Sequence, residues 1–158
     1  MSDSRTGWRP WIALLARLAM GGMFIYLGLM KLQDPSVFLK ILREYEIFPA
    51  SQPWLMNLTA SALPWMEVFC GGLLVLGIAV RGTALLMLVL MAGFTVAVYL
   101  RAAHLAEAGP MPLCSVEFDC GCGTGLVNTC GKLLENGALL LAGLVVLFGS
   151  SRRFCLWR

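Results

Sequence analysis

Residues 11–30, WIALLARLAMGGMFIYLGLM, decide the fold class, because this run is apolar apart from Arg17 and about as long as a membrane-spanning helix. Trp8 and Trp11 stand at its start, where aromatic side chains anchor a helix at the membrane interface. A cleaved signal peptide has a shorter apolar core followed by a cleavage site of small residues. We therefore expect an uncleaved spanning helix over about residues 11–31.

Three further apolar runs follow. We expect spans over about residues 61–80, 83–101 and 133–149. Pro64 divides the long apolar segment around the second span, which predicts a short approach to the membrane before residue 61. Only Arg81 and Gly82 separate the second span from the third, so these two spans must form an antiparallel hairpin.

The composition of the chain is that of a membrane protein, since 59% of its 158 residues are hydrophobic and 13% are charged. Soluble domains carry about 25% charged residues. The net charge of +3 is modest and no dense basic run occurs, so we expect no nucleic-acid partner. The sequence thus predicts a single all-α domain, an integral membrane four-helix bundle in the lipid bilayer.

A short amphipathic segment follows the first span. Asp34 and Pro35 form the typical start of a helix, an N-cap followed by proline in the first turn. Apolar residues then recur on one helical face, namely Val37, Phe38, Ile41, Leu42 and Tyr45. Because residues 34–47 are too few and too charged to span, we expect a helix lying in the membrane interface.

Basic residues indicate the orientation. Four spans place both termini on one side, which carries six Arg and Lys residues: Arg5, Arg9, Arg81, Arg152, Arg153 and Arg158. The other side carries five: Lys31, Lys40, Arg43, Arg101 and Lys132. The excess favours cytoplasmic termini in a bacterial inner membrane. The loop over residues 102–132 then faces the periplasm, where disulfides persist.

Four of the six cysteines lie in this loop: Cys114, Cys120, Cys122 and Cys130. A disulfide between Cys120 and Cys122 would close a small strained ring, and strained exposed disulfides exchange readily. Three connectivities are open, and so are structural staples, redox exchange and a metal site. The spacing lacks the C-x2-C pairs usual for zinc, so we expect no metal. Cys70, inside the second span, is expected to be inert.

Glu67 is an ionisable residue within the second span, and such groups need a partner. Lys31 lies at similar depth at the end of the first span and is the expected partner. The pair is either a structural lock or a site for protons or a quinone headgroup, on which Trp65 could stack. Glu135 and Asn136 open the fourth span and could face the same zone.

Several motifs resemble, in their order along the chain, the MauE branch of the DoxX-like membrane proteins. The first part carries Gly28-Leu29-Met30-Lys31-Leu32 and Asp34-Pro35, and the second span carries Pro64-x-x-Glu67 followed by Gly71-Gly72-Leu73-Leu74. Cys120-Gly121-Cys122-Gly123 is similar to the family's C-G-C-F-G signature, although Gly123-Thr124-Gly125 replaces the aromatic-containing turn. Cys114 and Cys130 are additions to that pattern.

The resemblance implies a four-helix membrane protein of methylamine utilisation, associated with maturation of a disulfide-rich dehydrogenase subunit alongside a thioredoxin-like partner. DoxX relatives form part of a quinone-reducing thiosulfate oxidoreductase. The resemblance also implies that Cys120 and Cys122 are redox thiols and that Glu67 and Lys31 form a buried polar pair.

We therefore expect a membrane redox protein that exchanges disulfides with a periplasmic thioredoxin-like protein and passes electrons to a membrane quinone. In this scheme a partner thiolate attacks a Cys120–Cys122 disulfide, and the reduced pair is reoxidised through Cys114 and Cys130. Two alternatives stay open, a non-catalytic anchor or assembly subunit of a redox complex and a metal-handling membrane protein. We expect a homo-oligomer or a subunit of a larger complex.

Overall fold

The computed structural model describes residues 9–49, 51–109, 111–121 and 125–149. Its helices are α1 (Arg9–Gln33), α2 (Pro35–Glu44), α3 (Pro53–Leu76), α4 (Val80–Ala108) and α5 (Thr129–Gly149). The 3-10 turn η1 (Leu113–Ser115) and an antiparallel pair of strands, β1 (Glu117–Asp119) and β2 (Leu126–Asn128), join α4 to α5. Four helices, α1, α3, α4 and α5, are long and apolar enough to cross a membrane. The predicted four-helix membrane fold is confirmed, with a small β-hairpin added.

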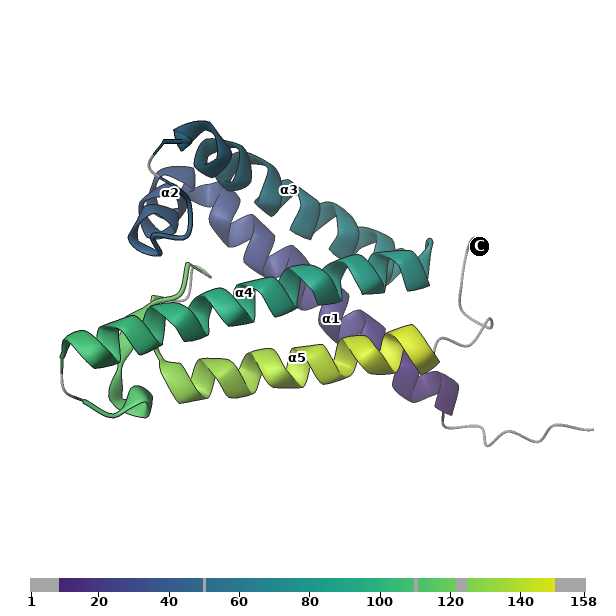
Figure 1. Ribbon diagram of the computed structural model, residues 1–158. Coiled ribbons are helices and arrows are strands. Elements are labelled where there is room, and N and C mark those ends of the chain that lie inside the picture. The colour runs from purple at the N-terminus through teal and green to yellow at the C-terminus, as the bar shows by residue number, and fades with distance from the viewer. Residues whose placement is uncertain (1–8, 50, 110, 122–124, 150–158) are drawn as a thin grey trace, which may run out of the picture.

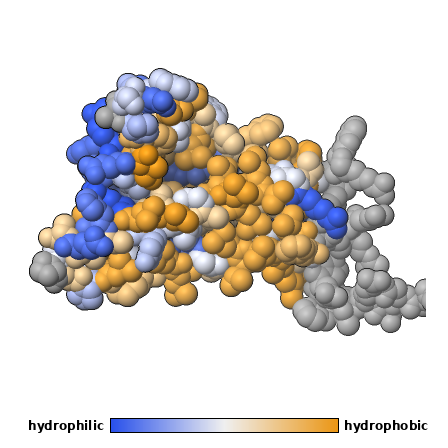
Figure 2. Space-filling model, viewed as in Figure 1, coloured by the Kyte–Doolittle hydropathy of each residue, from blue (hydrophilic) through white to orange (hydrophobic). Residues whose placement is uncertain are grey.

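The two ends of the bundle carry different elements (Figure 1). The hairpin end holds α2, η1, β1 and β2, whereas the terminal end holds the start of α1, the end of α5 and the turn between α3 and α4. A Cβ atom added at Gly149 would lie 3.7 Å from Cβ of Ala13, so α1 and α5 meet at the terminal end. Figure 2 shows a broad hydrophobic band beside the hydrophilic hairpin end, as a bilayer requires.

Large apolar side chains point both inward and outward. The inner cluster contains Met20, Phe24, Cys70, Leu74, Val80, Ala84, Met87, Met91 and Val146. Others, such as Leu15, Phe69 and Phe148, are more than half exposed on the outer surface. Such a surface would drive aggregation in water, but in a bilayer it meets lipid chains.

The helix bounds differ from the predicted spans. α3 begins at Pro53 and runs through Pro64 without a break, because a spanning helix tolerates the loss of one backbone hydrogen bond. It ends at Leu76, where Gly77 adopts a left-handed φ of 78° and the Ile78 N–H donates to the Leu73 carbonyl at 2.9 Å. α4 extends to Ala108 and α5 begins at Thr129, so the predicted loop over residues 102–132 is partly helical.

The predicted amphipathic helix is α2, and Asp34 caps it. The Asp34 carboxylate accepts hydrogen bonds from the Ser36 hydroxyl at 2.7 Å and the Val37 N–H at 3.3 Å. These two hydrogen bonds lower the pKa of Asp34. Its apolar face buries Phe38 and Ile41 inside the protein, whereas Val37 on the same face is 47% exposed. α2 is therefore packed on the hairpin end of the bundle.

Candidate functional site

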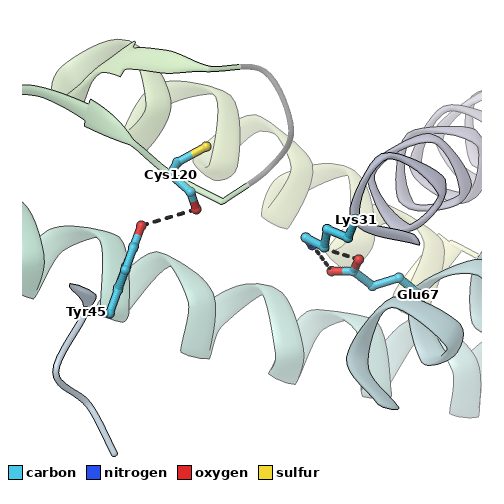
Figure 3. A network of polar contacts seen from close by, with 4 residues as sticks. All are labelled: Lys31, Tyr45, Glu67 and Cys120. Atoms are coloured by element: carbon cyan, nitrogen blue, oxygen red, sulfur yellow. Dashed lines mark hydrogen bonds and ion pairs between the residues drawn. The ribbon is translucent and has the colours of Figure 1, made fainter. Parts of the chain in front are cut away.

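Lys31 and Glu67 form an ion pair buried between α1 and α3 (Figure 3). Lys31 Nζ lies 2.6 Å from Oε1 and 2.7 Å from Oε2 of Glu67, so the ammonium meets both carboxylate oxygens. The two helices come close here, and the absence of a side chain at Gly28 permits it. A Cβ atom at Gly28 would stand only 2.9 Å from the Pro64 carbonyl oxygen. The predicted pairing of Lys31 with Glu67 is therefore present in the structure.

Two aromatic rings complete the surroundings of the Lys31 ammonium. Nζ lies 5.4 Å from the centroid of Phe38 and 5.8 Å from that of Phe94, within the range of cation–π attraction. Lys31 itself is 4% exposed. A carboxylate and two ring faces thus replace the water that a lysine ammonium normally binds.

A cavity of about 30 Å³ adjoins the ion pair, between α1, α3, α4 and α5. Its polar lining consists of Lys31, Glu67, Lys132 and Asn136, and Phe24, Leu27, Leu63, Leu90, Met91 and Phe94 supply apolar walls. A space of this size holds about one water molecule. On the outer surface, Figure 2 shows a recess between α3 and α4 towards the hairpin end.

Asn136 is fully buried at this cavity, and its Nδ2 and Oδ1 atoms make no hydrogen bond within the described part of the chain. Lys132 lies one helical turn earlier and binds the Glu135 carboxylate at 3.0 Å. The sequence placed Asn136 in this zone but missed Lys132, which counted as a basic residue flanking a span. The i, i+4 spacing of the two residues on one helix face was the available signal.

At the hairpin end, Cys114 and Cys130 form a disulfide that joins η1 to the first turn of α5, with their Cα atoms 5.0 Å apart. Asn128 forms hydrogen bonds with η1 and with the first turn of α5, the two elements that the disulfide joins. Its side-chain amide donates to the Cys114 carbonyl, and its Oδ1 accepts the Gly131 N–H at 3.2 Å, as an N-cap does. Cys114 is exposed and Cys130 is half-buried.

Cys120 follows β1 and is 1% exposed. The Tyr45 hydroxyl donates to the Cys120 carbonyl at 3.2 Å, and the Cys120 sulfur points away from Tyr45 (Figure 3). Tyr45 also meets Phe118 edge-on, with centroids 6.4 Å apart. Cys122 lies outside the described residues.

Gly121 forms the turn after Cys120 in a left-handed conformation, with φ of 74°. Its N–H donates to Oδ1 of Asp119 at 2.9 Å. A Cβ atom at Gly121 would lie 3.1 Å from Cγ2 of Ile41 and 3.6 Å from Cε2 of Phe38. α2 therefore supports the turn between the two cysteines, a contact that the sequence did not reveal.

Phe38 connects the two halves of the site. One ring touches the position of Gly121 and also lies beneath the Lys31 ammonium. Phe38 therefore lies between the turn after Cys120 and the buried ion pair.

Two other candidate residues, Trp65 and Cys70, do not line the cavity beside the ion pair. Trp65 is 64% exposed on the outside of the bundle and does not line the cavity. Cys70 lies in the inner apolar cluster. Among the described residues, which omit Cys122, no three His, Cys, Asp or Glu side chains gather closely enough to hold a metal ion.

Replacing Gly121 by Ala is expected to lower the free energy of unfolding by about 1–2 kcal/mol through the left-handed φ alone, and further through the contact with Ile41. The matched control is Gly125→Ala, since Gly125 has φ of 76° but no neighbour within 4 Å of an added Cβ atom. Thermal unfolding in detergent should show the larger loss for Gly121→Ala. Equal losses would mean that α2 does not support the turn.

Comparison with known proteins identifies the family. No curated protein and no solved structure matches the chain. The family model described as "Methylamine utilisation protein MauE" matches residues 9–149, from the start of α1 to the end of α5. The four candidate membrane helices lie within that match. The chain therefore belongs to the MauE family, multi-pass membrane proteins of methylamine utilisation.

Proposed function

We propose that this protein is a membrane thiol–disulfide redox protein that supports maturation of a disulfide-containing enzyme of methylamine utilisation. Its cysteines exchange disulfides with a periplasmic thioredoxin-like partner, and the electrons go to a membrane quinone. The observation that carries the proposal is the position of Phe38, whose ring would lie 3.6 Å from a Cβ atom at Gly121 and has its centroid 5.4 Å from Lys31 Nζ.

The exchange transfers two electrons from the partner to this protein. A dithiol of the partner becomes a disulfide, and one disulfide of this protein becomes two thiols. Cys120 and Cys122 are proposed as the pair that passes electrons towards the cavity, because Cys120 is buried in an apolar cluster that shares Leu27 and Phe94 with the cavity wall. The hydrogen bonds from the Tyr45 hydroxyl to the Cys120 carbonyl and from the Gly121 N–H to Asp119 fix the backbone of this turn.

The cavity offers donors for the oxygen atom of a quinone headgroup. Asn136 presents a buried amide, and Lys31 and Lys132 present ammonium groups beside Glu67. A volume of about 30 Å³ admits an oxygen-sized group, so the ring would lie in the recess between α3 and α4. A quinone bound there would supply the electron-accepting chemistry that completes the turnover.

The orientation forms part of the proposal, with cytoplasmic termini and a periplasmic hairpin end. Of the five basic residues counted on the hairpin side, Lys31 and Lys132 are buried inside the bundle and do not act as loop charges. Their removal from the count increases the excess of basic residues at the terminal end. The positive-inside rule then favours this orientation more strongly.

A second candidate function is a non-catalytic anchor or assembly subunit. The observation in its favour is the Cys114–Cys130 disulfide, which staples η1 to α5. An anchor of this kind would keep this disulfide oxidised at all times.

Thiol trapping distinguishes the two functions. Membranes are equilibrated in glutathione buffers, free thiols are alkylated with a heavy maleimide, and the gel shift is measured. We expect a cysteine pair that titrates between about −180 and −300 mV and that is lost in Cys120→Ser and Cys122→Ser. Cys70→Ser is the control and should titrate as the wild type does, because Cys70 lies in the inner cluster. Disulfides that survive until harsh reduction would support the anchor instead.

Replacing Asn136 by Leu tests the quinone site. Because a buried amide without partners costs about 1–3 kcal/mol, the variant is expected to unfold at a higher temperature than the wild type. It should also bind a short-chain quinone more weakly, as measured by quenching of tryptophan fluorescence in nanodiscs. Asn57→Leu, at an exposed position of α3, should change quinone binding little. Unchanged binding in Asn136→Leu would remove Asn136 from the site.

A further inference from the structure

The two ends of the described disulfide differ in accessibility and in surroundings. Cys114 belongs to η1 and is exposed at the hairpin end, whereas Cys130 lies half-buried in the first turn of α5. Cys120, the other described loop cysteine, is 1% exposed. A soluble protein can place its thiolate against a sulfur atom only where that atom is accessible, which favours Cys114 over Cys120 and Cys130.

We propose that the Cys114–Cys130 disulfide is the one that the soluble dithiol partner reduces, with attack at Cys114 and departure of Cys130. This proposal rests on the proposed function and changes the order in which the two cysteine pairs react. The sequence suggested that the partner attacks a Cys120–Cys122 disulfide first. The burial of Cys120 and the exposure of Cys114 favour the reverse order, from the Cys114–Cys130 pair to the pair that includes Cys120.

The position of Cys130 suits a leaving group. It lies in the first turn of α5, where the helix dipole favours a negative charge. A thiolate near a helix N-terminus is stabilised, and a better-stabilised thiolate leaves faster in disulfide exchange. Cys114 has no such stabilisation from η1, a turn of three residues. Attack at Cys114 therefore releases the more stable of the two thiolates.

The frame around the disulfide stays in place during this exchange. Asn128 donates to the Cys114 carbonyl and caps α5 through the Gly131 N–H, and Thr129 donates from both its N–H and its hydroxyl to the Val116 carbonyl. None of these bonds involves a sulfur atom. Opening the disulfide thus leaves the two cysteines close together and ready to be oxidised again.

The step is balanced as follows. A thiolate of the partner dithiol attacks Sγ of Cys114, the Cys114–Cys130 bond breaks, and Cys130 departs as a thiolate that then takes up a proton. The second thiol of the partner attacks the mixed disulfide and releases Cys114, so the partner is oxidised and this pair is reduced by two electrons. The Cys120–Cys122 disulfide is the internal oxidant that restores the pair.

Trapping of the mixed disulfide tests the assignment in the full-length, oxidised protein. The probe is a bacterial thioredoxin whose resolving cysteine is replaced by Ser, so that it forms a mixed disulfide but cannot complete the exchange. Released thiols are alkylated with N-ethylmaleimide and the peptides are mapped by mass spectrometry. We expect thioredoxin on Cys114 and the alkyl group on Cys130. Thioredoxin on Cys120, Cys122 or Cys130 would overturn the proposal while leaving disulfide exchange as the function.

Paired variants give a second measurement. In Cys120→Ser/Cys122→Ser only the surface pair remains, and its reaction with the probe should keep the wild-type rate. In Cys114→Ser/Cys130→Ser the rate should fall at least about tenfold, because the remaining pair includes a buried sulfur. The opposite ranking would overturn the proposal. If no cysteine of the wild-type protein forms a mixed disulfide and both pairs resist glutathione, the proposed function itself fails.

Discussion

Replacing Lys31 by Met is expected to lower the free energy of unfolding by about 3–5 kcal/mol, because the Glu67 carboxylate would remain buried without its counter-charge. In the structure the ammonium meets both carboxylate oxygens, at 2.6 and 2.7 Å. Glu67 is 7% exposed, so bulk water cannot solvate the carboxylate that has lost its partner. Unfolding in mixed micelles with increasing denaturing detergent measures the change.

The reverse deletion, Glu67→Leu, should cost less than Lys31→Met. The lone ammonium would still lie 5.4 Å from the Phe38 ring and 5.8 Å from the Phe94 ring, which attract a cation but repel a carboxylate. Lys40→Met, on the exposed face of α2, is the control and should change stability by less than about 0.5 kcal/mol.

The double variant Lys31→Met/Glu67→Leu separates a structural lock from a functional site. Replacing both charges by apolar groups of similar volume is often neutral or stabilising, so we expect most of the lost stability to return. The proposed quinone reduction should stay low in the same variant, because the polar groups beside Asn136 would be gone. A double variant that recovers both stability and turnover would reduce the pair to a structural role.

The pairing of Lys31 with Glu67 could be predicted from the sequence on two physical grounds. An ionisable residue inside a span needs a partner, and helix length fixes the depth at which a partner can lie. Lys31 at the end of the first span and Glu67 near the start of the second satisfy both conditions. The number and order of the spanning helices follow equally directly, because apolar runs of sufficient length have few other places to go.

Other features depend on tertiary packing and leave a weaker signal. Pro64 led to a predicted start of the second span near residue 61, but α3 is continuous from Pro53 to Leu76. The apolar face of α2 predicts contact with lipid, and a pattern of apolar residues cannot distinguish lipid from the turn at Gly121. Lys132 resembles a basic residue at the membrane boundary until α5 is placed against the cavity.

The second large effect is expected at the crossing of α1 and α3. A Cβ atom at Gly71 would lie 2.7 Å from the Gly21 carbonyl oxygen and 2.8 Å from Cγ1 of Ile25. The first neighbour is backbone, so relief requires the helices to move apart. Gly71→Ala is therefore expected to lower the free energy of unfolding by about 1–3 kcal/mol or more.

Gly72 provides a matched control on the same helix, because an added Cβ atom there has no neighbour within 4 Å. Gly72→Ala should leave stability unchanged or raise it by about 0.5–1 kcal/mol through the better helix propensity of Ala. The same contrast applies on α1, where Gly21 faces Gly71 and Gly22 faces open space. Thermal unfolding of the four single variants should separate Gly21 and Gly71 from Gly22 and Gly72. Equal behaviour of all four would mean that α1 and α3 do not cross at these glycines.

The crossing also sets the geometry of the ion pair. Gly28 lies further along α1 and makes the same kind of close approach, to the Pro64 carbonyl and to Cβ of Glu67. Moving the helices apart at Gly71 would lengthen the contact between Lys31 and Glu67, whose polar atoms now lie within 2.7 Å. Gly71→Ala should thus weaken the proposed quinone binding as well as stability, although its Cβ atom does not touch the cavity. Small residues at one helix crossing therefore determine whether two buried charges further along the same helices can meet.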